Sequence, residues 1–234
     1  MYGLEVDGHF WKNDLKSFSW MAPRDKLIDP TVALWLVLGS DEELLASNNL
    51  YGLSLLTIAV QAQRGYHFPI MILQTAGKLL VPEQLSTPLK EANVLVASDT
   101  GLGAKVVAKV HAASNPIPSE YHLDIYANEQ IGQWFEIVPA SSSWPGAMFG
   151  VSDAEIAFHA VGLKGQLPSK TVLNYPIQGM KLQMGEKEYL AWATQNELDP
   201  ATSYFVKVDG YPESIIFGPY STAEAADVFV VRLK

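Results

Sequence analysis

Three uninterrupted apolar runs constrain the fold of this chain more than any other feature of its sequence. They are residues 31–38, 68–73 and 93–97. None of these runs alternates between apolar and polar residues, as a strand with one solvent-exposed face does. Continuous apolar, β-prone runs are typical of strands that are covered on both faces, as in parallel sheets. The sequence therefore predicts at least three buried strands.

Helical patterns follow the first and third of these runs. Ser40 is placed to cap a short helix, and a longer helix is expected to end at Arg64, before Gly65 as C-cap. Residues 104–113 place valines on one broad face and lysines on the other. With a fourth strand expected at 121–127, the order of strands and helices predicts an α/β fold. We expect a doubly wound, mainly parallel sheet of Rossmann or flavodoxin type.

A domain boundary is expected near residues 139–146, which are small, polar and bracketed by prolines. Residues 1–140 would form the α/β domain, and residues 141–234 a smaller α+β domain or an extension of the first. Short β-prone segments follow the boundary, and Asp209-Gly210 is a turn signal between two of them. The spacing of Ala226, Phe229, Val230 and Leu233 predicts a closing helix. We therefore expect the chain to end as strand, strand, helix.

This ending resembles a known family over a short stretch. Gly218-Pro219-Tyr220-Ser221 leads into Glu224-Ala225, and the segment from Tyr204 to Leu233 resembles the closing strand–strand–helix of sporulation-related peptidoglycan-binding repeats. The matching residues are those that any junction between a hairpin and a helix favours, so no function is transferred. No family is recognised over the whole chain.

Charge and cysteine content exclude several classes of function. The 16 Lys and Arg against 25 Asp and Glu give a net charge of −9, and no basic stripe is visible. Nucleic acid and membrane are therefore not expected partners. The absence of cysteine excludes thiolate metal sites and cysteine nucleophiles. Because the N-terminus lacks the pattern of a secretory signal, a cytoplasmic location is expected.

Two polar segments that follow predicted strands form a candidate ligand crevice. Its residues are Gly39, Ser40, Asp41, Asp99, Thr100, Gly101 and Gly103. In an open parallel sheet such loops share one edge, where ligands bind at a switch in strand order. Asp41 and Asp99 would there bind ribose hydroxyls or a divalent cation. Neither segment completes a phosphate-binding motif, and such residues also end strands and cap helices without binding anything. No particular cofactor is indicated.

Histidines supply the remaining catalytic candidates. No two of the five lie four residues apart and no HExxH motif occurs, so no sequence-local metal site is predicted. His122 shares a strand face with Asp124 and is a candidate base with its orienting carboxylate. His159 is expected on the face opposite Phe158. Together with Asp41 and Asp99, these histidines would form a dispersed catalytic set, although strand alternation alone often produces such neighbours.

Trp144 is the candidate interface residue. It stands between Ser143 and Pro145 in a predicted loop, and exposed tryptophans favour binding surfaces. A loop tryptophan either docks on its own protein or contacts a partner.

The absence of local catalytic motifs favours a non-catalytic binding or regulatory protein that recognises a small ligand or a protein partner. The first alternative is a hydrolase or transferase acting on a nucleotide-like or sugar-like substrate, because dispersed active sites leave no local motif. The second is a structural subunit of a larger assembly or a homo-oligomer, which the high apolar content and the tryptophans suit.

Overall fold

The computed structural model describes residues 3–112, 118–221 and 228–234, and in it the chain is mostly β. Twelve strands within these residues form one parallel and two antiparallel sheets. The chain divides into two compact units, residues 1–117 with Lys234 (unit 1) and residues 118–233 (unit 2). The division thus lies at 117/118, and the predicted boundary at 140/141 falls inside unit 2.

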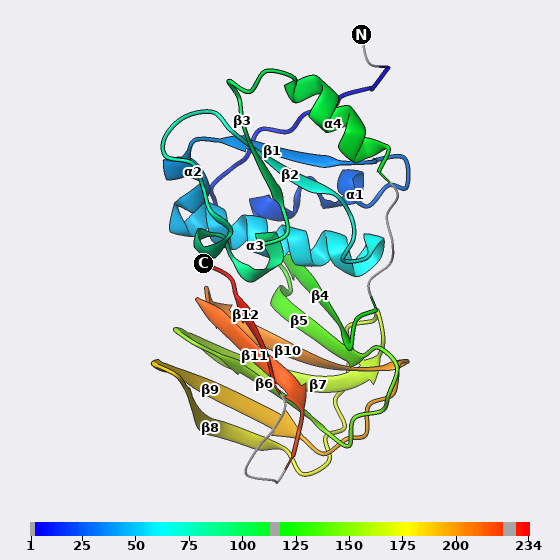
Figure 1. Ribbon diagram of the computed structural model, residues 1–234. Helices are drawn as coiled ribbons and strands as arrows, with labels where there is room; N and C mark the ends of the chain where they lie inside the picture. The colour runs from blue at the N-terminus through cyan, green and yellow to red at the C-terminus, as the bar shows by residue number, and fades with distance from the viewer. Residues whose placement is uncertain (1–2, 113–117, 222–227) are drawn as a thin grey trace. The chain divides into compact units, whose positions relative to one another are not determined.

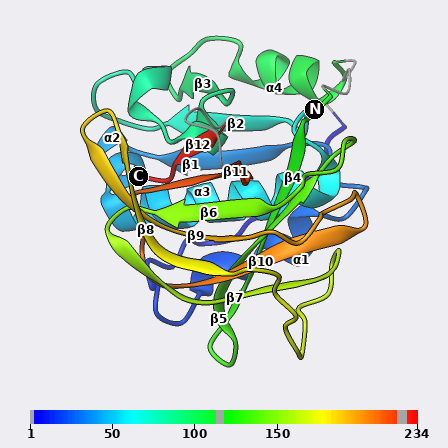
Figure 2. The same ribbon diagram turned by 90° about the horizontal axis from the view of Figure 1, so that it is seen from below.

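Unit 1 contains a parallel three-stranded sheet in the order β1-β2-β3, whose strands lie side by side in Figure 2. Helices α3 and α4 lie on opposite faces of this sheet (Figure 1). Within the described residues, no helix is both long and apolar enough to cross a bilayer. The elements are η1 (Ser19–Met21), α1 (Arg24–Leu27), β1 (Trp35–Gly39), α2 (Asp41–Leu45), α3 (Ser47–Arg64), β2 (Ile70–Gln74), η2 (Pro82–Gln84), η3 (Thr87–Leu89), β3 (Asn93–Val96) and α4 (Leu102–Val110).

Local sequence explains the helices of unit 1. Ser40 begins α2 with a capping box, since its Oγ accepts a hydrogen bond from Glu43 N (3.2 Å) and its N–H donates to Glu43 Oε2 (2.8 Å). Helix α3 ends at Gly65, whose φ of 85° suits glycine. Residues 50–60 of α3 are buried on every side, which is why their apolar residues cover the whole circumference. The predicted long helix and its C-cap are confirmed.

The predicted fold class is wrong. The expected fourth strand exists as β4 (Tyr121–Asn128), but it pairs with an antiparallel neighbour in unit 2 and does not extend the parallel sheet. The parallel sheet keeps three strands in sequence order, so the reversal of strand order that defines a Rossmann or flavodoxin fold is absent from the described strands. The apolar runs identified strands correctly, but a run of this kind carries no information about its partner.

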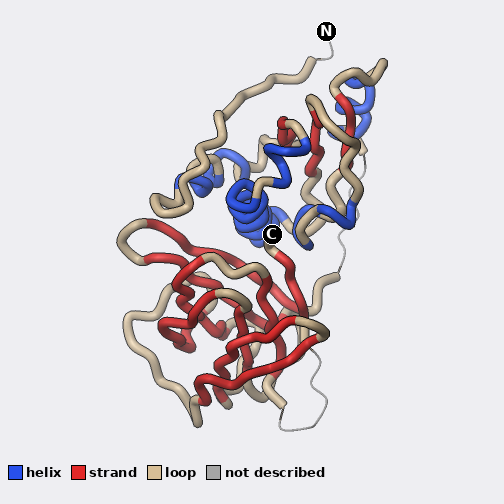
Figure 3. Tube along the Cα trace, turned by 90° about the vertical axis from the view of Figure 1, so that its left-hand side faces the viewer, coloured by secondary structure: helices blue, strands red, loops and turns tan. Residues whose placement is uncertain are grey.

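Unit 2 consists of two antiparallel sheets, and its described residues contain no helix, as the colouring of Figure 3 shows. The four-stranded sheet has the order β4-β5-β10-β7, and the five-stranded sheet the order β12-β11-β6-β9-β8. The strands after β4 are β5 (Gly132–Pro139), β6 (Ala147–Val151), β7 (Ala154–Leu163), β8 (Ile177–Met184), β9 (Lys187–Thr194), β10 (Thr202–Gly210), β11 (Ser214–Pro219) and β12 (Phe229–Arg232).

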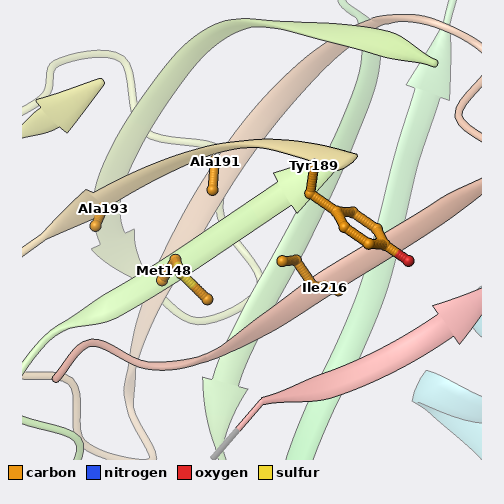
Figure 4. Packing of buried hydrophobic residues seen from close by; sticks show 5 residues of the cluster. All are labelled: Met148, Tyr189, Ala191, Ala193 and Ile216. Atoms are coloured by element: carbon orange, nitrogen blue, oxygen red, sulfur yellow. The ribbon is translucent and has the colours of Figure 1, made fainter. Parts of the chain in front are cut away.

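Aromatic side chains join the two sheets. Phe135 of β5 contacts Phe149 of β6 with 5.2 Å between ring centroids, and Phe149 stacks near Phe217 of β11 at 6.4 Å. All three are fully buried, and each such side chain contributes roughly 1.5–3 kcal/mol through burial. The opposite face of the five-stranded sheet carries a second buried cluster (Figure 4). It consists of Met148, Tyr189, Ala191, Ala193 and Ile216.

The predicted strand–strand–helix ending is also wrong. Strands β10 and β11 follow one another, but Asp209 and Gly210 end β10 and pair with β7 rather than forming the predicted turn, and the two strands belong to different sheets. Phe229–Arg232 forms β12, which pairs with β11, and residues 222–227 of the predicted helix lie outside the described residues. One of the short β-prone segments that follow the predicted boundary, residues 171–175, forms no strand. The likeness to sporulation-related repeats therefore does not extend to the fold.

Candidate metal site

The predicted crevice of unit 1 is split by β2. Strands β1 and β3 both pair with β2, so the turns that follow Gly39 and Val96 share one sheet edge without being neighbours. Two strand spacings separate them by about 10 Å. The two acidic turns therefore share the expected sheet edge, with the end of β2 between them.

The acids of this crevice already have partners within unit 1. Asp41 Oδ2 accepts a hydrogen bond from Lys78 N (2.9 Å), and Asp99 forms an ion pair with Lys105 at 2.8 Å. Gly101 takes the left-handed conformation that caps α4, in which Gly103 lies, while Thr100 belongs to the preceding turn. The arrangement agrees with the alternative in which these residues only end strands and cap helices.

Trp144 docks on its own unit. Its backbone N–H and carbonyl pair with those of Leu198, at 2.8 and 2.9 Å, and its side chain is only 6% exposed. Little of this side chain is left for a partner to contact.

His159 lies between the two sheets of unit 2. It is 3% exposed, whereas Phe158 on the opposite face is 44% exposed, as strand alternation predicts. The Tyr204 hydroxyl lies 2.7 Å from His159 Nδ1, and the Trp192 ring packs against the imidazole. Burial lowers the pKa of His159 to about 4 and raises the pKa of Tyr204. The imidazole is therefore neutral and accepts a hydrogen bond from the protonated Tyr204 hydroxyl. His159 is therefore a hydrogen-bonded residue of the buried core.

The other face of the four-stranded sheet brings three ligand-type side chains together. Asp124 of β4 stands directly opposite Glu136 of β5, and His122 precedes Asp124 by two residues on the same face. One ligand atom from each side chain lies within 4.8 Å of the other two. In the described part of the chain, no other three His, Asp or Glu side chains converge in this way.

Glu136 is fully buried and held by three neutral donors. Its Oε1 accepts hydrogen bonds from Ser203 Oγ (2.5 Å) and Gly165 N (2.7 Å), and its Oε2 accepts one from Tyr126 Oη (2.7 Å). Asp124 is 1% exposed, and its Oδ1 accepts a hydrogen bond from Ile125 N (2.7 Å). Two buried carboxylates therefore face each other across one strand pair.

His122 is half-buried at the edge of this cluster. Burial lowers its pKa, the charge of Lys164 lowers it further, and Glu136 opposes both. The first two effects prevail, so the neutral imidazole, which has a free lone pair, is the favoured form.

Sequence reasoning placed His122 beside Asp124 but missed Glu136. The missing information was the hairpin that joins β4 to β5. Its turn carries a recognisable signal, because Asn128 Oδ1 accepts hydrogen bonds from Gln130 N and Ile131 N, and Gly132 follows with a φ of 74°. With that turn located, counting back along both strands sets residue 124 opposite residue 136.

A second acidic feature of unit 2 is an open pocket of about 450 Å³ lined by Asp153, Glu186, Glu188 and Glu213. Lys187 enters this lining and forms an ion pair with Glu213 at 2.7 Å. Its carboxylates contact solvent and no histidine joins them. The pocket is therefore a weaker candidate than the buried cluster.

The contact between Asp41 and the turn at Gly77 can be tested by a matched pair of glycines. Gly77 and Gly101 share a φ of +87°, but a Cβ on Gly77 would lie 1.7 Å from Asp41 Oδ1, whereas Gly101 has open space. We expect Gly101→Ala to cost about 1–2 kcal/mol of backbone strain. Gly77→Ala should cost a further ~1.5–3 kcal/mol, because the displaced carboxylate loses its hydrogen bond to Lys78 N.

Urea denaturation of both variants measures the difference. Repeating Gly77→Ala in an Asp41→Ala background should reduce its cost to that of Gly101→Ala. An undiminished cost in that background would show that Asp41 is not what Gly77 accommodates.

The pKa of His159 predicts how stability depends on pH. Because the folded pKa, about 4, lies below the ordinary value of 6.5, the unfolded chain binds more protons between these values. The free energy of unfolding contributed by His159 is therefore complete above pH 6.5 and is lost as pH falls towards 4. At about 1.4 kcal/mol per pKa unit, the loss is at most ~3.5 kcal/mol. His159→Gln should flatten this slope in denaturation monitored by circular dichroism. The exposed His67→Gln should not, and equal slopes in the two variants would contradict the assignment.

No family model, curated protein or solved structure matches this chain. What the protein does is therefore inferred from its own geometry, in which the cluster of His122, Asp124 and Glu136 is the strongest feature.

Proposed function

We propose that the protein binds a divalent metal ion through His122, Asp124 and Glu136. The observation that supports this most is the pair of buried carboxylates facing each other across β4 and β5 with an imidazole beside them. Two negative charges so close in a low-dielectric interior repel each other even with donors on Glu136, and a cation between them would relieve that repulsion. A divalent cation offsets both charges at once and uses the imidazole as well.

The chemistry of the side chains suits this role. Imidazole and carboxylate are the common ligands of divalent first-row metals. Ligand atoms around a zinc-sized ion, with bonds of about 2.0–2.1 Å, stand roughly 3.3 Å apart. In the structure the ligand atoms lie up to 4.8 Å apart, so binding would shorten the distances between them by about 1.5 Å. Small rotations of the side chains can achieve this. The half-buried His122 is the ligand nearest solvent and provides the route of entry.

A metal-binding role narrows the sequence-based expectation of a protein that binds a small ligand. The hydrolase or transferase hypothesis and the assembly-subunit hypothesis remain predictions from the sequence, since no observation on unit 2 favours them over metal binding. The cluster combines one half-exposed and two buried ligands. Such a cluster is best suited to holding a metal ion.

The test is calorimetric titration of chelator-treated full-length protein with Zn²⁺. We expect one ion per chain, and a loss of affinity of about 100-fold or more in Glu136→Gln and in His122→Asn. The matched control is Glu188→Gln, which removes a carboxylate from the acidic pocket and should leave the affinity unchanged.

The metal-free protein provides an independent readout. Removal of one of two repelling carboxylates by Asp124→Asn should leave the metal-free protein at least as stable as the wild type, while the stabilisation by Zn²⁺ disappears. In the wild type, that stabilisation should reach about 2.7 kcal/mol at a free ion concentration 100 times Kd. Absence of a stoichiometric heat in the wild type, or unchanged binding by Glu136→Gln, would refute the role.

A further inference from the structure

The hydrogen bonds to Glu136 limit how this carboxylate can ligate an ion. Each carboxylate oxygen has two lone pairs. Ser203 Oγ and Gly165 N use both lone pairs of Oε1, and Tyr126 Oη uses one lone pair of Oε2. A single lone pair of Oε2 is left, so Glu136 can offer a metal ion one ligand atom and not two.

Asp124 also has a hydrogen-bonded carboxylate oxygen. Its Oδ1 already accepts a hydrogen bond from the adjacent Ile125 N, and its strand is fixed opposite β5 by continuous antiparallel pairing. The backbone positions of both carboxylates are thus set by the sheet, which does not flex as a loop does. The cluster provides three protein ligand atoms, one of them an imidazole nitrogen.

From this count, the geometry points to a site that selects a zinc-class transition-metal ion over Ca²⁺ and Mg²⁺, an inference that rests on the proposed metal-binding function. Ca²⁺ takes six to eight oxygen ligands and is commonly held by bidentate carboxylates, which Glu136 cannot supply here. Mg²⁺ requires octahedral oxygen ligands and gives up its water reluctantly. Three protein ligands that include an imidazole, with water in the fourth position, are typical of Zn²⁺.

Ser203 is the specificity-determining residue in this arrangement. Its hydroxyl is one of the two donors on Oε1, the oxygen that a bidentate carboxylate would also have to offer. Removal of the hydroxyl frees one lone pair of Oε1, so that Glu136 can then offer both oxygens to one ion. Ser203 does not itself contact the ion, so it acts by positioning Glu136.

Competition titrations of chelator-treated full-length protein with Zn²⁺, Ca²⁺ and Mg²⁺ test the selectivity. We expect Zn²⁺ to bind at least about 1,000-fold more tightly than either of the other ions. Ser203→Ala should lower the ratio of Zn²⁺ to Ca²⁺ affinity about 10-fold, a change of the size that loss of an outer-shell partner causes. The control, Ser142→Ala, alters an exposed serine of the same unit and should leave the ratio unchanged.

The outcomes separate the two claims. If the wild type binds none of the three ions, metal binding itself is refuted. Comparable affinities for Zn²⁺ and Ca²⁺ would overturn the selectivity and leave metal binding intact. Equal ratios in Ser203→Ala and Ser142→Ala would remove Ser203 from its role. The absorption of the Co²⁺-loaded protein adds a readout of geometry, because four-coordinate Co²⁺ gives intense visible bands and six-coordinate Co²⁺ gives weak ones. Weak bands in the wild type would also contradict the selectivity.

Discussion

The antiparallel pairing of β4 with β5 is the constraint on which the candidate site depends. It sets Asp124 opposite Glu136 and leaves His122 on the same face two residues away. If one strand shifted by one residue against the other, its polar side chains would turn towards the aromatic core and its apolar side chains would turn outward. The inner face of this pair carries Phe135, which contacts Phe149 of the other sheet. Packing of the core therefore fixes the register, and the register fixes the ligands.

Elements outside this hairpin complete the site. Strand β10 pairs with β5 and contributes Ser203, while the chain that leaves β7 contributes the Gly165 N–H. Both donate to the same oxygen of Glu136. Near Gly162, the chain folds back closely enough that an added Cβ would meet Pro168 at 3.1 Å and Phe205 at 3.6 Å. Strand alternation places Glu136 on the outer face of the sheet, yet its side chain is fully buried, and three protein donors take the place of solvent around its carboxylate.

The sequence predicts the elements of this protein better than their partners. Apolar runs locate β1, β2 and β3, and the cap at Ser40 with the glycine at Gly65 locates the helices between β1 and β2. The pairing of strands that are distant in the chain leaves no comparable sequence pattern, so the sequence predicts the wrong sheet for β4. Phe229 and Val230 fit a helical spacing and a strand equally well in so short a segment, and pairing with β11 decides for the strand. Within the site, His122 and Asp124 lie two residues apart and are predicted as a base with its orienting carboxylate rather than as metal ligands, whereas Glu136 requires the turn.

The two histidines of unit 2 show why residue type alone did not separate site from core. His122 and His159 lie in the same four-stranded sheet and both have a lowered pKa, but on opposite faces. The Nδ1 of His159 is occupied by the hydroxyl of Tyr204, a donor that burial keeps protonated, and an aromatic ring lies against the imidazole. His122 instead faces two carboxylates, which can share a cation with it but cannot donate a proton to it when ionised. The neighbours that tertiary pairing supplies thus decide whether a buried imidazole completes a hydrogen bond or a ligand set.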